Sequence, residues 1–356
     1  MNKEPGVAYI GFGGHCNQSH VPYLPSSEST IVGVADLDDA SLEAAKASGE
    51  ISGNAIFTND YHELLADNAT DAVIITTGDA WHFRIAEDAL QAGKHVLVEK
   101  PAAATITELA KLPALFDLAD EKNRRLWVCH PREFGDGPWS QAAKLLGNAS
   151  LLSEAFAVGT MGSLRELRYD CLYTMPSKTG LHASFADDKL NHTIVSALRT
   201  LPETIGFENA VLLDNDSTQY DARMVTLPED QSAEKVVVRA SGRRTAHTEH
   251  HQGGVYRDWI EAVFDEGVVR VEPSLGRIAL TYGKVEQDPI RFDTSRLYDG
   301  MFGAFNRAFI DHVRNPQKTD PLTNRTKILG TAAAILMQQP GFDGVITEHA
   351  VRQLTV

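Results

Sequence analysis

The sequence is poor in cysteine and in long hydrophobic runs. Cys16, Cys129 and Cys171 are its three cysteines; they lie far apart and form no C-x-x-C pair. A disulfide framework or a zinc ribbon is therefore not expected, and a reducing cytoplasm fits the composition. No apolar run approaches the roughly 20 residues that cross a bilayer, and the residues before Val7 form no apolar signal segment. We therefore expect neither export nor a membrane anchor.

Positive charge is also in short supply. Lys and Arg number 33 against 48 Asp and Glu, which gives a formal net charge of -15. The acidic residues are spread along the chain, so the field around the protein repels phosphate backbones and anionic lipid heads. Nucleic acid and membranes are therefore not expected partners. With 356 residues, 43% of them hydrophobic, the chain is expected to fold into two globular domains.

Short apolar runs alternate with amphipathic stretches in the first part of the chain. The runs predicted to be buried parallel strands are Val7–Ile10, Thr30–Ala35, Ala72–Ile75, His95–Val98 and Leu126–Cys129. Helical periodicity is found at 81–92 and 105–122, where Pro113 is expected to kink the second helix or to shift its start. This order predicts an α/β domain with a parallel sheet in residues 1–130.

The pattern changes in the remainder of the chain. Longer alternating segments at Glu234–Ser241 and Gly267–Val271 indicate strands of a mainly antiparallel sheet. Met301–Val313 and Thr326–Met337 return to helical periodicity. Residues 131–356 are therefore expected to form an α+β domain that has a large open sheet with helices on one face.

A glycine-rich turn follows the first predicted strand. Its residues are Gly11, Phe12, Gly13, Gly14, His15 and Cys16. Glycines there allow a tight bend and let backbone N–H groups approach a pyrophosphate. Cys16 stands where the third glycine of G-x-G-x-x-G is usual, and Pro22 and Pro25 predict a short or irregular first helix. Taken alone, the loop is also explained as a tight turn without a ligand.

Asp36 ends the second predicted strand, about 20 residues beyond the glycine turn. A carboxylate at this position can bind the adenosine ribose hydroxyls and repels a 2′-phosphate. Because Leu37 and not arginine comes next, the sequence favours NAD over NADP. The alternative is that Asp36 is a solvated turn residue.

The tripeptide Glu99-Lys100-Pro101 directly follows the predicted strand His95–Val98. The carboxyl edge of a parallel sheet is where ligands bind. Lys100 could donate a hydrogen bond to a substrate oxygen and stabilise a developing alkoxide, while Glu99 could accept from the nicotinamide ribose hydroxyls. A surface ion pair is the alternative explanation.

The run from Gly93 to Pro101, with the pattern G-K-H-V-x-x-E-K-P, resembles the signature of the Gfo/Idh/MocA oxidoreductases, the glucose-fructose oxidoreductase and inositol dehydrogenase type. The resemblance extends along the first part of the chain. In chain order it also includes the glycine turn, Asp36, Asp71–Thr77, His82 and, after Pro101, Arg132-Glu133-Phe134. It implies an NAD-binding Rossmann domain followed by a substrate-binding domain.

The resemblance also assigns residues around the cofactor. It implies that Thr77 and His82 lie near the dinucleotide and that the Lys100–Pro101 peptide bond is cis. Gly78 and Asp79 stand where the family has proline and asparagine after its fourth strand, so the turn at this point is expected to differ locally.

Family members carry an aspartate followed four residues later by a histidine in the second domain. Asp188 and His192 have that spacing, which places both on one face of a helix. The resemblance implies that His192 exchanges the hydroxyl proton and that Asp188 orients the imidazole. Alternatively, Asp188 caps a helix and His192 is a packing residue. Lys189, Asn191 and Arg168 are further candidate substrate contacts.

The activity that the resemblance implies is transfer of a hydride between NAD and a hydroxyl-bearing carbon of a sugar, an inositol-like polyol or a related small molecule. Two alternatives stay open: an NAD-assisted glycoside hydrolase of the same fold, and a non-catalytic NAD-binding sensor. The family also implies a homodimer or homotetramer. His247-Thr248-Glu249-His250-His251 could suggest zinc, but an exposed turn is the simpler interpretation, and no metal is expected.

Overall fold

The structure is a computed structural model that describes most of the first part of the chain and segments of the rest. The described residues are 4–26, 28–51, 53–131, 134–135, 140–141, 145–146, 148–175, 204–212, 219–227, 236–246, 256–292, 299–315, 328, 331–332, 335–336 and 351–354. The chain divides into two compact units. The first comprises Met1–Gly135, Tyr298–Ile328 and Thr355–Val356, and the second Asp136–Leu297 and Leu329–Leu354.

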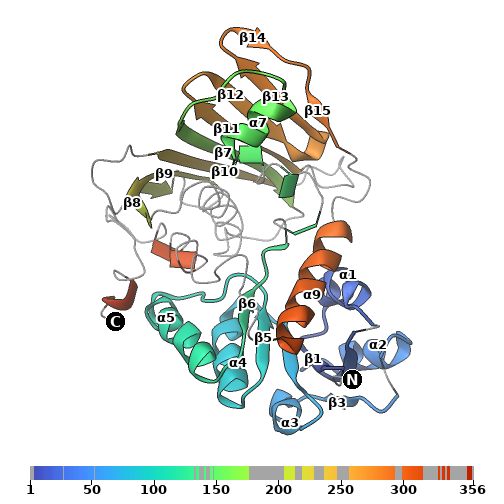
Figure 1. The fold of residues 1–356 in the computed structure, drawn as a ribbon. Coiled ribbons are helices and arrows are strands. Elements are labelled where there is room, and N and C mark those ends of the chain that lie inside the picture. The colour runs from blue at the N-terminus through green and yellow to red at the C-terminus, as the bar shows by residue number, and fades with distance from the viewer. Residues whose placement is uncertain are drawn as a thin grey trace. The chain divides into compact units, whose positions relative to one another are not determined.

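A parallel sheet forms the centre of the first unit (Figure 1). Its strands are β1 (Gly6–Ile10), β2 (Thr30–Ala35), β3 (Ile56–Thr58), β4 (Ala72–Ile75), β5 (His95–Val98) and β6 (Leu126–Val128). The order β3-β2-β1-β4-β5-β6 is that of a doubly wound dinucleotide-binding fold. The five predicted runs are all strands. The short edge strand β3 was not predicted.

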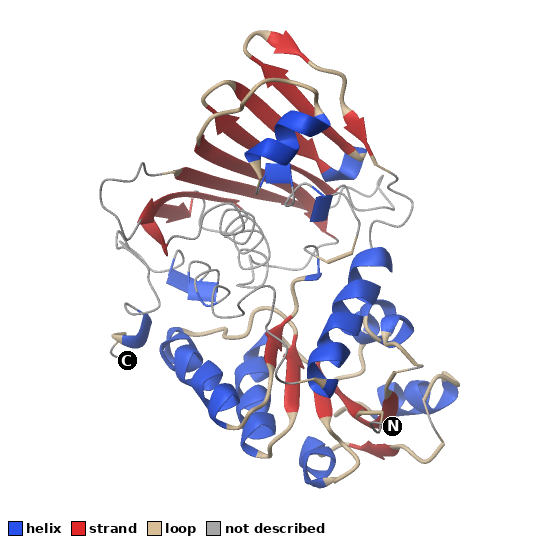
Figure 2. Ribbon diagram, viewed as in Figure 1, coloured by secondary structure: helices blue, strands red, loops and turns tan. Residues whose placement is uncertain are grey.

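Helices flank this sheet on both faces (Figure 2). They are α1 (Gly14–Ser19), the 3-10 helix η1 (Val21–Tyr23), α2 (Asp39–Ala47), α3 (Tyr61–Ala66), α4 (Asp79–Gln91), α5 (Ile106–Glu121) and α9 (Asp299–Arg314). The first helix is short, as predicted, with six residues. In α5 a capping box between Thr105 and Glu108 sets the start, and Pro113 lies inside the helix.

Helix α9 belongs to the first unit, whereas the sequence pattern predicts residues 131–356 as a single second domain. Phe305, Phe309 and Ile310 on this helix are fully buried in the core of the parallel sheet. The ring of Trp127 on β6 lies 5.4 Å from that of Phe305 and 5.8 Å from that of Phe309. Each such buried side chain contributes roughly 1.5–3 kcal/mol, which explains why the helix returns to this core.

The second unit contains a nine-stranded sheet of order β14-β13-β12-β11-β7-β10-β9-β8, with β15 paired to β13. The strands are β7 (Leu164–Met175), β8 (Thr204–Leu212), β9 (Gln219–Leu227), β10 (Val237–Ala246), β11 (Tyr256–Phe264), β12 (Gly267–Glu272), β13 (Arg277–Tyr282), β14 (Val285–Glu286) and β15 (Ile290–Arg291). All pairs are antiparallel except β7 with β10. The mainly antiparallel second sheet is thus confirmed.

Short helices of the described part of this unit include α7 (Ala149–Ala155) and the 3-10 helix η3 (Pro273–Leu275). Leu167, Ile260 and Ala262 are buried, and their strand neighbours Arg168 and Glu261 point to the opposite, more exposed face. Across the described parts of both units, no helix is long and apolar enough to cross a membrane.

Candidate functional site

The glycine turn links β1 to α1 at the carboxyl edge of the parallel sheet. Gly11 has a φ of +87°, and a Cβ on it would lie 2.8 Å from the backbone nitrogen of Thr77, so this position requires glycine. A Cβ on Gly13 or Gly14 would meet no atom within 4 Å. The turn therefore leaves open space along its backbone, the kind of cradle that a pyrophosphate needs.

Cys16 replaces the third glycine of the motif and is fully buried. Burial raises the pKa of its thiol to about 12, so the side chain is a neutral packing group. Small size at this position is what close packing of the helix on the sheet demands.

Asp36 is tied to the glycine turn. One carboxylate oxygen accepts from the backbone N–H of Phe12 at 2.6 Å, and the other accepts from the N–H of Asp38 at 2.9 Å. The bond from Phe12 joins the end of β2 to the turn after β1 and holds the carboxylate beside that turn, whereas the bond from Asp38 closes the local turn after β2. Leu37 next to it is 83% exposed. Asp36 is therefore more than a solvated turn residue.

His82 joins two segments at the same edge of the sheet. Its buried ring lies between two backbone oxygens, with Nε2 at 3.0 Å from the oxygen of Thr77 and Nδ1 at 2.9 Å from that of Pro101. The Lys100–Pro101 peptide bond is cis, as predicted. His82 thus fastens the start of α4 to the segment that follows β5.

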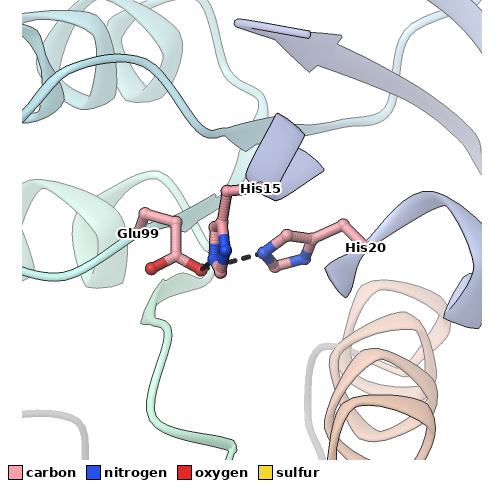
Figure 3. Close-up of side chains that lie close together, drawn as sticks. All are labelled: His15, His20 and Glu99. Carbon is pink, nitrogen blue, oxygen red and sulfur yellow. Dashed lines mark hydrogen bonds and ion pairs between the residues drawn. The ribbon is translucent and has the colours of Figure 1, made fainter. Parts of the chain in front are cut away.

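Glu99 is a buried, hydrogen-bonded carboxylate at this edge, with only 5% of the residue exposed. Figure 3 shows the rings of His15 and His20 converging on one of its oxygens. Both Nε2 atoms lie 2.9 Å from Oε1, and Oε2 accepts from the backbone N–H of Lys100 at 3.2 Å. A surface ion pair does not describe so buried a carboxylate.

The charge state of Glu99 follows from these contacts. Burial by itself would raise the pKa of the carboxyl group, but the hydrogen bonds from His15 and His20 outweigh it and hold the pKa well below the usual range. The carboxylate is therefore an anion at neutral pH, ready to accept further hydrogen bonds.

His20 and Asn306 are site residues that the sequence analysis missed. The ring of His20 is fully buried, and its Nδ1 lies 3.4 Å from Oδ1 of Asn306 on α9. These two residues are 286 positions apart in the chain. No local pattern could have indicated the contact, because neither residue belongs to a recognisable motif.

Some predicted residues lie outside the described part of the chain. They are Asp188, His192, Lys189, Asn191, Arg132, Glu133 and the segment from His247 to His251. Arg168 is described, and its guanidinium pairs with Glu166 and with Glu261, each at 2.9 Å. The geometry available is therefore that of the cofactor side of the predicted site.

A metal ion is also conceivable at the three side chains of Figure 3. In the described residues His15, His20 and Glu99 form a group whose candidate ligand atoms all lie within 4.8 Å of one another. The two N···O distances of 2.9 Å are those of direct hydrogen bonds, so these groups satisfy one another without an ion.

The fold and the cofactor side of the site are those of a dinucleotide-binding oxidoreductase domain. Residues 6–130 match the family model GFO_IDH_MocA, described as "Oxidoreductase family, NAD-binding Rossmann fold". The predicted resemblance to this family is thus confirmed for the segment that the model covers.

Curated relatives match part of the chain. YhhX, an uncharacterised oxidoreductase of Escherichia coli, is 34% identical over 145 residues, which is 40% of each protein. Inositol 2-dehydrogenase of Salmonella typhimurium is 31% identical over 128 residues, 36% of each protein. An uncharacterised oxidoreductase of Schizosaccharomyces pombe is 38% identical over 117 residues, 32% of this chain and 31% of the relative. The chain thus aligns with at most 40% of the length of these three.

Solved structures share the fold over nearly the whole chain. Apo scyllo-inositol dehydrogenase from Lactobacillus casei has a TM-score of 0.66 at 19% identity, covering 94% of this chain and 95% of its own. Levoglucosan dehydrogenase, in complex with NADH and levoglucosan, has a TM-score of 0.69 at 16% identity, covering 93% and 95%. At such identities the likeness shows the fold alone.

Proposed function

We propose that the protein is an NAD-dependent oxidoreductase that moves a hydride between nicotinamide and a hydroxyl-bearing carbon of a sugar, a polyol or a related small molecule. The observation that carries this proposal is the buried, ionised Glu99 beside Lys100 at the carboxyl end of β5, on the same sheet edge as a glycine turn with an open cradle. The family match over residues 6–130 supports the same class of activity.

NAD fits the residues at this edge. The backbone of Gly13 and Gly14 would receive the pyrophosphate, Asp36 the adenosine ribose and Glu99 the nicotinamide ribose. We prefer NAD to NADP because a 2′-phosphate would be repelled by the Asp36 carboxylate. Bound NAD supplies the hydride acceptor; the protein residues orient the substrate and handle its proton.

Three side chains take the catalytic roles in this proposal. The Lys100 ammonium donates a hydrogen bond to the substrate oxygen and stabilises negative charge that develops on it. His192 takes the hydroxyl proton in the oxidation and returns it in the reduction, while Asp188 orients its ring. The last two assignments rest on the family spacing alone.

The test compares wild-type protein with Lys100→Met and with Lys111→Met, a matched control on the exposed side of α5. NADH formation is measured over a panel of sugars and cyclic polyols, and NAD binding by calorimetry. We expect Lys100→Met to lower turnover by about 10²- to 10⁴-fold and Lys111→Met to behave as wild type.

Three outcomes would overturn this reading. Wild-type protein that binds neither NAD nor NADP contradicts it outright. Binding of NAD without turnover on any substrate would favour the sensor. Cleavage of a glycoside without net accumulation of NADH would favour the NAD-assisted hydrolase.

We also expect a homodimer or homotetramer. Residues of opposite charge alternate on the more exposed face of the second sheet, where Glu166 pairs with Arg168 and with Arg239, and Arg168 also pairs with Glu261. Such a face can match a second copy of itself around a two-fold axis. Light scattering after gel filtration would give the mass, and a monomer at micromolar concentration would contradict the expectation.

A cytoplasmic location completes the proposal. Cys16 and Cys129 are buried and form no disulfide among the described residues, which suits a reducing compartment. Cell fractionation with an antibody to the protein would test it, and recovery outside the cytoplasm would contradict it. The net charge of -15 leaves the small-molecule substrate as the expected partner and disfavours nucleic acid.

A further inference from the structure

The two carboxylate oxygens of Glu99 accept different numbers of hydrogen bonds. A carboxylate oxygen has two lone pairs. Both lone pairs of Oε1 are used by His15 and His20, whereas Oε2 accepts one bond, from the Lys100 N–H. Among the described contacts, Oε2 therefore keeps one acceptor position, and that is where a ligand hydroxyl would bind.

We propose that His20 is a positioning residue that acts through Glu99: it holds Oε1 in place so that Oε2 is presented to the nicotinamide ribose hydroxyls. This inference rests on the proposed function, because it needs a dinucleotide at this edge of the sheet. It adds a residue that lies beyond the glycine motif and that contacts neither substrate nor cofactor in our assignment.

The ring of His20 is itself held rigidly. It is fully buried, and the ring of Phe302 on α9 makes an edge-on contact with it at 5.6 Å between ring centroids. The ring of Tyr23 stacks on Phe302 at 6.3 Å. Asn306, one turn further along α9, faces Nδ1 of His20. The position of the imidazole is thus set by a helix from the far end of the chain.

Asn306 suits this task because an amide offers both a donor and an acceptor. Its Oδ1 can accept from a protonated Nδ1, and after a flip of the amide its Nδ2 can donate to an unprotonated Nδ1. Either way Nε2 of His20 remains a donor to Glu99. The buried Nδ2 of Asn306 has no hydrogen-bond partner in the described structure, so such a flip would exchange the Nδ1···Oδ1 contact for a bond from Nδ2 and would break no bond of Nδ2.

His15 has a different part in the cluster. Its side chain is 52% exposed, compared with 0% for His20, although both rings bond the same oxygen. Solvent competes for an exposed donor, so His15 is the weaker constraint on the carboxylate.

The experiment uses the full-length protein in four forms: wild type, His20→Leu, His20→Gln and His62→Leu. His62 is a matched control histidine, 60% exposed on α3. NAD binding is measured by calorimetry, and KM for NAD and kcat are measured separately. Loss of one hydrogen bond to a charged group predicts weakening of NAD binding by about 10- to 100-fold in His20→Leu.

The conservative variant separates positioning from mere packing. The amide of His20→Gln can still donate to Glu99, so we expect its NAD affinity to stay within about 3-fold of wild type. KM for NAD should rise in His20→Leu while kcat at saturating NAD changes less. His62→Leu should match wild type in both.

A double-mutant cycle tests whether His20 acts through Glu99. In a Glu99→Gln background, His20→Leu should weaken NAD binding no further, since the group that it positions is gone. Equal effects of His20→Leu in both backgrounds would overturn the proposal. So would a folded His20→Leu protein that binds NAD as tightly as wild type does.

A substitute variant and a zinc-binding measurement provide two further tests of the role of His20. Should His20→Leu fail to fold, Asn306→Ser supplies the same comparison, and unchanged NAD affinity in that variant overturns the inference. One equivalent of zinc bound to purified wild-type protein, lost in His20→Gln, would also overturn it in favour of a metal site. Wild-type protein that does not bind NAD at all would instead refute the proposed function.

Discussion

Strand β5 has a buried ionisable group at each end, and the two groups are in opposite charge states. His95 begins the strand, Glu99 follows its last residue, and each is 5% exposed. Burial, together with the charges of Arg124 and Arg125, lowers the pKa of His95 to about 4. At Glu99 two imidazoles outweigh the effect of burial and keep the pKa well below its usual range. One end of the strand is thus kept neutral, and the other is kept charged.

The difference shows which of the two ends carries a buried charge. Neutral His95 is a structural acceptor: its Nδ1 receives the backbone N–H of Arg125 at 3.2 Å, which links β5 to the start of β6. A buried charge such as Glu99 persists only with well-placed partners, because desolvation opposes it. Its position at the carboxyl edge, where ligands bind in such sheets, suits a functional group.

The largest stability effect is expected at the charged end. Glu99→Leu removes the acceptor of two imidazoles, one of them fully buried, and breaking a buried pair in this way costs about 3–5 kcal/mol of unfolding free energy. Urea denaturation measures it, with Glu121→Leu on the exposed side of α5 as the control. A loss below about 1 kcal/mol would show that the cluster is not a tight ion pair.

We expect His95, at the neutral end, to make the largest contribution to the loss of stability between pH 6.5 and 4. Because the pKa of His95 is lowered from 6.5 to about 4 in the folded protein, the unfolded chain binds more protons between these values, and stability falls as the pH drops through this window. The full effect is about 3 kcal/mol. Glu99, whose pKa is depressed, loses its contribution only below the usual glutamate range.

The pH dependence is checked by denaturation of wild type and of His95→Gln at a series of pH values. The glutamine oxygen can still accept from Arg125 N–H, so the variant should lack the slope between pH 6.5 and 4. Parallel curves for the two proteins would contradict the assignment to His95.

A smaller effect is expected at Lys94, next to His95. Its ammonium donates to the backbone oxygens of Asp67 and Thr70, both at 2.8 Å. Lys94→Met would leave two carbonyl groups without this donor and lower the unfolding free energy by about 1–3 kcal/mol. NAD affinity should not change, since this end of the strand lies away from the proposed cofactor. Loss of NAD binding in this variant would contradict the assignment of a purely structural role to this end of the strand.

The smallest effect is expected at the cap of α5, which follows the charged end. Thr105→Ala removes the side chain that accepts from the N–H of Glu108 and should cost about 1 kcal/mol. Thr105→Ser keeps the cap and should match wild type. Thermal unfolding gives both values. NAD binding should be equal in the three proteins, which would show that a helix start near the site is purely structural.

Local patterns were enough to predict the elements nearest the proposed cofactor. Continuous apolar runs predict the parallel strands, and local sequence signals predict the glycine turn after β1, Asp36 after β2 and the Glu99-Lys100-Pro101 segment after β5. Strand β3 was not predicted, because its three residues are too few to show a periodicity. The roles of Asp188 and His192 stay predictions, since both lie outside the described residues.

The sequence by itself determined what depends on neighbours in the chain: buried strands of continuous apolar residues, a turn at Gly11 that needs a positive φ, and an acidic residue at the end of a strand. Only the tertiary structure decided that α9 closes the first core, that His95 is neutral and that His20 meets Glu99, 79 residues away. The physical reason is that burial and charge depend on which distant segments pack together, and no repeat or spacing in the chain records that choice.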